Sequence, residues 1–246
     1  MAKHIVLIAG VSASGKSASL RNLKNQEKVF YLNTEMKPLP FSNKFKTLKN
    51  GLENPMDIFP LFQQLEEKED IDIIVIDSLT FLMDKFEDKY ISGNRGSGSS
   101  VYDSWIQYNQ FFKNLVQGVI PKSNKTWIIL AHNREELTNS GNYKYFVPIK
   151  GSLKNTGIEA YFTTVIYTRR IPIDELKQFT YDENYLQITP RDEAVGYKHC
   201  FQCEPTRDIA DCRIRSNIGC FNEKQVFINN DCQLLLEHLN KYYGLN

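Results

Sequence analysis

The residues with the clearest chemical potential lie near the start of the chain, in Gly10-Val-Ser-Ala-Ser-Gly15-Lys16-Ser17. This segment matches G-x4-G-K-[ST], in which glycines let backbone N–H groups approach phosphate, the lysine reaches the β- and γ-phosphates and the serine ligates Mg²⁺. The purely structural alternative is a Gly/Ser turn before a helix that binds no ligand. We predict a site for ATP and Mg²⁺. Its nucleotide-binding residues are Gly10, Val11, Ser12, Ala13, Ser14, Gly15, Lys16, Ser17 and Ala18.

Two carboxylates follow strand-like segments further along the chain. Asp77 ends the buried run "IIVID", and we expect it to hold Mg²⁺ with Ser17; the alternative is that it caps the next helix. Glu35 follows "VFYLN" and could act as general base on the water that attacks the γ-phosphate. Taken alone, Glu35 is better explained as an ordinary surface residue; its position just after the strand that follows the phosphate loop favours the catalytic role.

Strand-like and helical segments alternate along the first two-thirds of the chain. This alternation predicts an α/β fold with a mostly parallel sheet flanked by helices, whose ligands bind beyond the carboxyl ends of the strands. The expected strands are 4–9, 29–32, 71–76, 127–131 and 160–169, and the expected helices are 16–23, 57–68 and 102–116. The segment 133–155 is expected to be a polar loop.

The sequence changes character after about Pro172, becoming rich in β and turn signals before a final helix, Cys232 to Tyr243. We expect a core over residues 1–170 and an extension over 171–246 packed on it, together one domain. Cysteines in this part raise the alternative of a zinc site. The alternating pattern around them favours free buried cysteines instead. They are Cys200, Cys203, Cys212 and Cys220.

The order of these motifs resembles the RecA-like ATPases. "YLNTEM" is similar to the catalytic-glutamate segment of that superfamily, "IIVIDSLTFL" to its second ATPase motif, and "WIILAHN" to its sensor strand. The resemblance covers roughly residues 4–170 and is closest to short phage proteins that consist of a RecA core and act in recombination and single-strand annealing.

The resemblance implies a catalytic set of Glu35, Lys16 and His132. His132 stands where RecA has a glutamine that senses the γ-phosphate, and Asn133 is the alternative sensor. The alternative for His132 is a purely structural histidine at a strand end, with its ring nitrogens hydrogen-bonded and no catalytic role.

The resemblance also implies two loops that hold single-stranded DNA. The first is 92–100 with Arg95; the second is 134–154, where basic and aromatic residues interleave as in a stacking groove. An ordinary surface loop is the alternative, and we expect both loops to lack fixed structure without ligand. The basic residues of the second loop are Arg134, Lys144, Lys150 and Lys154.

A ring or filament of identical subunits is a further implication. A neighbouring subunit would then form the other wall of the ATP site and insert a cation in trans, and a single-strand DNA-binding protein is a second expected partner. The candidate in-trans residues are Arg207, Arg213 and Arg215, with solvated arginines as the alternative.

Bulk properties limit the function classes. The chain of 246 residues carries a net charge of +1, which argues against a strongly basic coat protein and predicts modest, salt-sensitive DNA affinity. No apolar run is long enough to span a membrane, and no signal peptide is evident, so we expect a cytoplasmic protein, in the host cytoplasm if it is phage-encoded.

These features favour an ATPase that acts on single-stranded DNA in recombination or annealing, with DNA-stimulated hydrolysis. The alternatives are a P-loop nucleotide or small-molecule kinase, and an ATP-dependent DNA clamp with little turnover. An Arg-rich lid segment is not evident, which makes the kinase less attractive.

Overall fold

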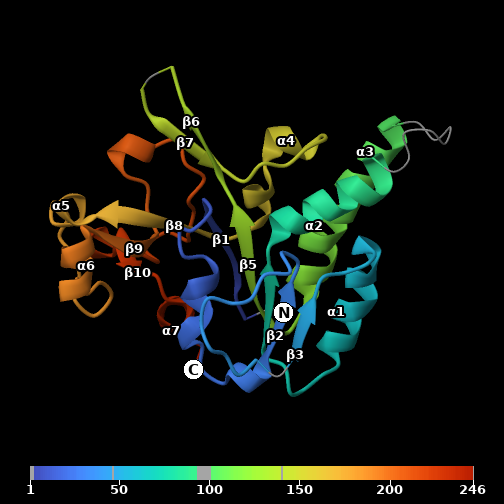
Figure 1. Ribbon diagram of the computed structural model, residues 1–246, viewed down its shortest axis with the longest axis horizontal. Helices are drawn as coiled ribbons and strands as arrows, with labels where there is room; N and C mark the ends of the chain where they lie inside the picture. Colours follow the sequence, from blue (N-terminus) through green and yellow to red (C-terminus); the bar gives the residue numbers. More distant parts are fainter. Residues whose placement is uncertain (1–2, 46, 93–100, 140, 246) are drawn as a thin grey trace.

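An eight-stranded sheet runs through the molecule in the computed structural model, which describes residues 3–45, 47–92, 101–139 and 141–245 (Figure 1). Its strand order is β10-β9-β8-β1-β5-β4-β2-β3. The strands of this sheet are β1 (Ile5–Gly10), β2 (Val29–Asn33), β3 (Thr47–Asn50), β4 (Ile73–Asp77), β5 (Thr126–His132), β8 (Thr164–Pro172), β9 (Tyr197–Gln202) and β10 (Phe227–Asn229). The predicted α/β fold with a mostly parallel sheet is confirmed.

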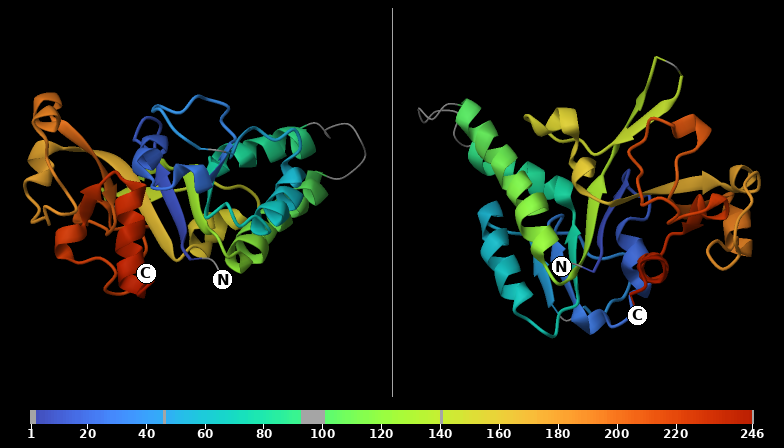
Figure 2. Two further views of the ribbon diagram at one scale, coloured as in Figure 1. Left: turned by 90° about the horizontal axis from the view of Figure 1, so that it is seen from below. Right: turned by 180° about the vertical axis from the view of Figure 1, so that it is seen from behind.

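Helices cover both faces of the sheet (Figure 2). The longer ones are α1 (Ile58–Glu66), α2 (Leu79–Phe86), α3 (Val101–Lys113) and α7 (Cys232–Tyr243), and the shorter turns that matter below are η1 (Ser17–Asn22), η4 (Glu87–Ser92), α6 (Pro190–Val195) and η8 (Arg207–Ile209). Residues of α1, α2 and α3 share one apolar cluster with alternate strand residues such as Leu7 and Trp127. The opposite strand residues pack against Leu20 of η1 and Leu235 of α7. This two-sided burial explains the continuous apolar runs of the central strands.

The parallel register of the central strands sets which residues meet at one edge. Gly10 at the end of β1 lies beside His132 of β5, and Asp77 at the end of β4 lies between Leu130 of β5 and Asn33 of β2. Strand β5 therefore separates the strand of the phosphate loop from the strand that ends in Asp77.

The C-terminal extension continues the sheet. Strands β8, β9 and β10 pair antiparallel, and a third apolar cluster, which includes Ile171, Cys200 and Phe227, packs beneath them. Because β8 pairs with β1 on one side and β9 on the other, the sheet crosses residue 170 without a break. The division at that residue stays a prediction.

The helix expected over residues 16–23 is present, but as the 3₁₀ helix η1, which ends where the chain turns to extended geometry at Leu23. Two other regions differ from the predictions. An edge strand, β3, lies where no strand was expected. The expected loop 133–155 contains a hairpin of β6 (Arg134–Leu137) and β7 (Tyr143–Phe146), closed by a bond from Thr138 N to the Asn142 carbonyl and stabilised where β7 buries Tyr145.

Two buried histidines connect helix α7 to the neighbouring segments through hydrogen bonds. In His238, Nε2 donates to the Cys220 carbonyl at 2.6 Å and Nδ1 lies 3.0 Å from the Tyr185 hydroxyl, which donates to it. His4 binds Asn240 of the same helix at 2.7 Å. Burial lowers the pKa of both histidines below the ordinary 6.5.

We predict that acid loosens this attachment. Because the folded pKa is lowered, the unfolded chain binds more protons below its pKa of 6.5, so stability is present above that pH and lost as the pH falls through it. Urea unfolding at about pH 7.5 and about pH 5.5 should show a lower free energy of unfolding at the acid end. His238→Gln should weaken that dependence, and an unchanged dependence would contradict the assignment.

Candidate nucleotide-binding and catalytic site

The phosphate loop holds Lys16 over its own backbone. The ammonium of Lys16 donates to the carbonyls of Gly10 and Val11 at 2.9 Å each and lies 3.4 Å from His132 Nδ1. Lys16 is 6% exposed, and this burial lowers its pKa to about 8. A phosphate in the loop would therefore meet an ammonium that little water screens.

The backbone of the loop is fixed by contacts from β8, from β9 and from the segment after β10. Thr168 Oγ1 donates to the Ser14 carbonyl at 2.9 Å, and His199 Nδ1 donates to the same oxygen at 2.7 Å. Gly15 adopts φ +104°, and a Cβ there would lie 2.9 Å from Asn230 Nδ2. Only glycine fits this position without strain, which explains the second glycine of the motif.

Asp77 has one satisfied and one unsatisfied oxygen. Its Oδ2 accepts hydrogen bonds of 2.6 Å from both Ser17 Oγ and Tyr31 OH, whereas Oδ1 is buried without a partner among the described residues. Burial raises the pKa of this carboxyl. A buried carboxylate oxygen with free lone pairs beside a serine hydroxyl fits a hard divalent cation. Ser17 and Asp77 are thus the residues that would hold Mg²⁺.

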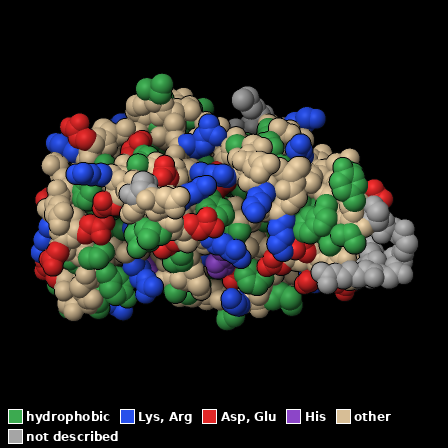
Figure 3. All heavy atoms as spheres, turned by 90° about the horizontal axis from the view of Figure 1, so that it is seen from above, with side chains coloured by type: hydrophobic (Ala, Val, Ile, Leu, Met, Phe, Trp, Pro, Cys, Tyr) green, Lys and Arg blue, Asp and Glu red, His purple; other side chains and the backbone are tan. Residues whose placement is uncertain are grey.

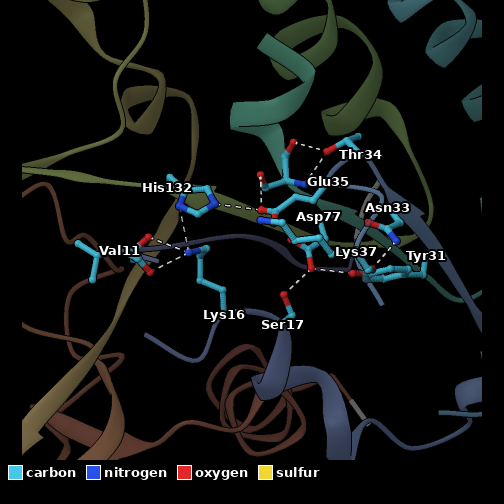
Figure 4. A network of polar contacts seen from close by, with 12 residues as sticks. Val11, Lys16, Ser17, Tyr31, Asn33, Thr34, Glu35, Lys37, Asp77 and His132 are labelled. Atoms are coloured by element: carbon cyan, nitrogen blue, oxygen red, sulfur yellow. Dashed lines mark hydrogen bonds and ion pairs between the residues drawn. The ribbon is translucent and has the colours of Figure 1, made fainter. Parts of the chain in front are cut away.

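Glu35 lies against His132 at the mouth of the site (Figure 4). Its Oε1 is 2.9 Å from His132 Nε2 and accepts a 3.1 Å bond from Ser78 Oγ, and its Oε2 is 3.3 Å from the Lys37 ammonium. The bond from His132 is the main reason that the pKa of Glu35 falls to about 2. Glu35 is therefore a charged hydrogen-bond acceptor, and a weak base while these donors contact it.

His132 connects Lys16 to Glu35. A proton on Nε2 lets it donate to Glu35, and the free Nδ1 can then accept from Lys16. Its backbone N–H is held by Thr80 Oγ1 at 2.8 Å. The structure thus brings together the predicted Lys16, Ser17, Glu35, Asp77 and His132, whereas Asn133 lies on the opposite side of His132, in a second cavity described below.

Sequence reasoning missed three residues of this site. Tyr31 supplies the second bond to Asp77, and Thr34 exchanges bonds of 2.7 Å with the backbone N–H and carbonyl of Ser78. Tyr31 and Asn33 are two residues apart in β2 and therefore point to the same face of the sheet, and Asn33 pairs with Asp77. The alternation of side chains along the strand could thus have predicted that Tyr31 lies near Asp77. Thr34 and Ser78 carried no signal beyond their place at strand ends.

A cavity of about 1040 Å³ lies over the phosphate loop. One side consists of loop residues with Glu35 and His132, and the other side belongs to the C-terminal extension of the same chain, including Arg191, Lys198 and His199. The expectation that a neighbouring subunit forms the other wall is thus not needed for this part of the cavity.

A second cavity, of about 520 Å³, lies on the other side of His132. Helix α2 and the β6–β7 hairpin form its walls, and three residues predicted to touch DNA, Arg134, Lys150 and Lys154, line it with Asn133. Lys150 is paired with Glu87. Lys144 lies instead over the Phe146 ring, 5.6 Å from its centroid. Arg95 lies outside the described residues.

The three arginines predicted to act in trans occupy different settings. Arg213 pairs with the buried Glu159 at 3.0 Å, and Arg215 donates to the Ala160 carbonyl at 3.2 Å. Arg207 is exposed on η8. Around Arg213 the described chain forms an isolated bridge, from Arg215 to Val165, instead of a strand. A role in trans stays a prediction for all three.

The cysteines are divided between different apolar clusters. Cys200 packs in the third cluster, whereas Cys203 and Cys220 pack on the α7 side of the sheet, and all are free. Burial raises the pKa of the Cys200 thiol to about 12. Within the described ranges, three or more His, Cys, Asp or Glu side chains nowhere gather as metal ligands would.

The strand order and the site define a P-loop ATPase core. A model of the family described as "AAA domain" matches residues 2–197, so the chain belongs to this family of P-loop ATPases. Membership implies nucleotide binding, typically with Mg²⁺. A search of curated proteins finds no match. Among solved structures, a KaiC-like protein of the hyperthermophilic archaeon Pyrococcus horikoshii OT3 aligns with TM-score 0.45 and 12% identity, over 88% of this chain and 83% of that chain.

In the described part of the chain, no helix is both long and apolar enough to cross a bilayer.

We predict that Gly15→Ala weakens nucleotide binding. The added methyl must displace Asn230, and the alanine must adopt a backbone conformation with positive φ that L residues rarely take. Both effects distort the loop. Gly219→Ala is the matched control, because Gly219 has φ +74° but open space around its Cβ. Titration with a fluorescent ATP analogue should show at least about tenfold weaker binding for Gly15→Ala only. Equal affinities in both variants would contradict the steric account.

Proposed function

We propose that this chain hydrolyses ATP and couples hydrolysis to single-stranded DNA in recombination or annealing. One observation carries the ATPase part: a charged carboxylate, Glu35, sits on the same histidine that contacts the phosphate-loop lysine. A carboxylate in that place can orient water for hydrolysis; in a kinase the same group would act on an acceptor hydroxyl, so the acceptor test below separates the two.

Each residue has a distinct role in this proposal. Lys16 and the loop backbone bind the phosphates, and Ser17 and Asp77 hold Mg²⁺, which when bound neutralises phosphate charge. Glu35 orients the attacking water through a carboxylate oxygen. Its low pKa favours orientation over proton removal until His132 shifts away.

The DNA part of the proposal rests on the second cavity. It shares His132 with the nucleotide cavity, and Arg134 and Lys154 present cationic side chains at its wall. A strand that binds there would press on His132 and change the bond between His132 and Glu35. DNA could thereby alter the orientation of Glu35, and so the rate of hydrolysis.

The surface charge favours modest DNA affinity. On the face seen from above Figure 1, Lys and Arg side chains are spread between Asp and Glu side chains (Figure 3). With a net charge of +1, such a surface releases few counterions on binding. Assembly into a ring or filament would raise the affinity by placing several such faces along one strand.

We predict that single-stranded DNA raises the ATPase rate of the wild-type chain, and that Lys16→Ala abolishes both basal and stimulated rates. The measurement is phosphate release with and without an unstructured oligonucleotide. Unchanged turnover and unchanged assembly size with DNA would refute the DNA coupling. Phosphate transfer to an added nucleoside monophosphate or alcohol would favour the kinase.

We further predict that Arg134→Ala with Lys154→Ala reduces DNA affinity by about tenfold and lowers the salt dependence of binding, because two phosphate contacts are lost. Basal ATPase without DNA should change little. The control is Lys224→Ala, an exposed lysine far along the chain on the extension. Fluorescence anisotropy at several salt concentrations measures both quantities, and identical salt slopes would argue against contact at this cavity.

A further inference from the structure

A cation of the C-terminal extension faces the nucleotide cavity from the side opposite the phosphate loop. Lys198 lies near the start of β9, in register with Ile171 of β8, and lines the same cavity as Lys16 and Ser17. Its neighbour His199 holds the phosphate-loop carbonyl of Ser14. The backbone that carries Lys198 is therefore fixed directly to the loop.

An ion pair holds the Lys198 side chain. Its ammonium is 2.9 Å from Asp192 Oδ2, and the side chains are only 12% and 19% exposed. Asp192 is fixed in turn, because the same oxygen accepts from Thr189 N at 2.9 Å and Thr189 Oγ1 at 2.8 Å in the capping box of helix α6.

This arrangement leaves donors for a ligand. An ammonium has three protons, and the pair with Asp192 uses one of them. The two neutral donors of Thr189 keep the carboxylate in place, so a ligand can approach the remaining protons without moving the ion pair. A positive group so placed can bind phosphate oxygens without the entropic cost of ordering a free lysine.

We infer that Lys198 contacts the phosphates of the bound nucleotide in cis, as the second cation of the site beside Lys16. The effect of Lys198 on hydrolysis rests on the proposed function, whereas its contact with the phosphates concerns nucleotide binding alone. It differs from the prediction that arginines of a neighbouring subunit supply this charge. Arg213 and Arg215 are engaged with Glu159 and the Ala160 carbonyl, outside the nucleotide cavity.

Two variants test the contact. Lys198→Met should lower kcat/KM for ATP by about a hundredfold, the typical loss when one donor to developing charge is removed. Lys177→Met is the matched control: Lys177 pairs with Glu193 of the same helix α6, but the pair is about half exposed and lies outside the cavity. Lys198→Arg should recover part of the loss. Equal activity of Lys198→Met and Lys177→Met would overturn the inference.

A mixing experiment separates action in cis from action in trans. Lys16→Ala and Lys198→Met are combined, and co-purification of differently tagged chains confirms that mixed assemblies form. Action in cis predicts only the sum of the residual activities, because no chain carries both lysines. Recovery of a substantial fraction of wild-type activity would mean that Lys198 serves a neighbouring site, and the inference would fail.

Binding of a fluorescent ATP analogue distinguishes a failure of the Lys198 contact from a failure of the proposed ATPase activity. If the wild-type chain binds the analogue but hydrolyses no ATP, the proposed ATPase falls, while weaker binding by Lys198→Met than by Lys177→Met still supports the contact. Equal binding by the two variants in that case would count against Lys198 itself.

Discussion

The parallel register of the central strands is the constraint on which the site depends. It places the ends of β1, β4, β5 and β2 at one edge, so that Gly10 meets His132 and Asp77 meets Asn33. The bond from Ser17 Oγ to Asp77 Oδ2 then crosses from the phosphate loop to a strand two places away in the sheet. A shift of one residue in β4 would turn Asp77 to the opposite face and break this bond.

His132 is the point at which the two cavities meet. It binds Glu35 on one side, faces Lys16 on another, and lines the cavity of the β6–β7 hairpin. A polar group at a strand end, fixed by its backbone bond to Thr80, can move its ring while the strand stays in place. In our account this ring is the physical link between what the hairpin binds and where Glu35 points.

Much of this arrangement followed from the sequence, and the reasons for the failures are physical. The loop motif and the apolar runs predicted the sheet and the residues at its edge, because both depend on local pattern and burial. The hairpin escaped detection because β6 is exposed throughout and has no apolar alternation; the tertiary burial of Tyr145, which stabilises it, cannot be read from the local pattern. The extension's part in the nucleotide cavity also escaped, since the antiparallel pairing of β8, β9 and β10 is what brings Lys198 to the cavity and Asn230 to the loop.

The central claim is that Glu35 directs water at a bound nucleotide. The most direct measurement is single-turnover phosphate release by Glu35→Gln, with ATP binding measured on the same sample. The account predicts that the variant binds ATP within a few-fold of wild type and releases phosphate at least about a hundredfold more slowly, the usual share of a group that positions or deprotonates the nucleophile. Release at the wild-type rate with full binding would contradict it.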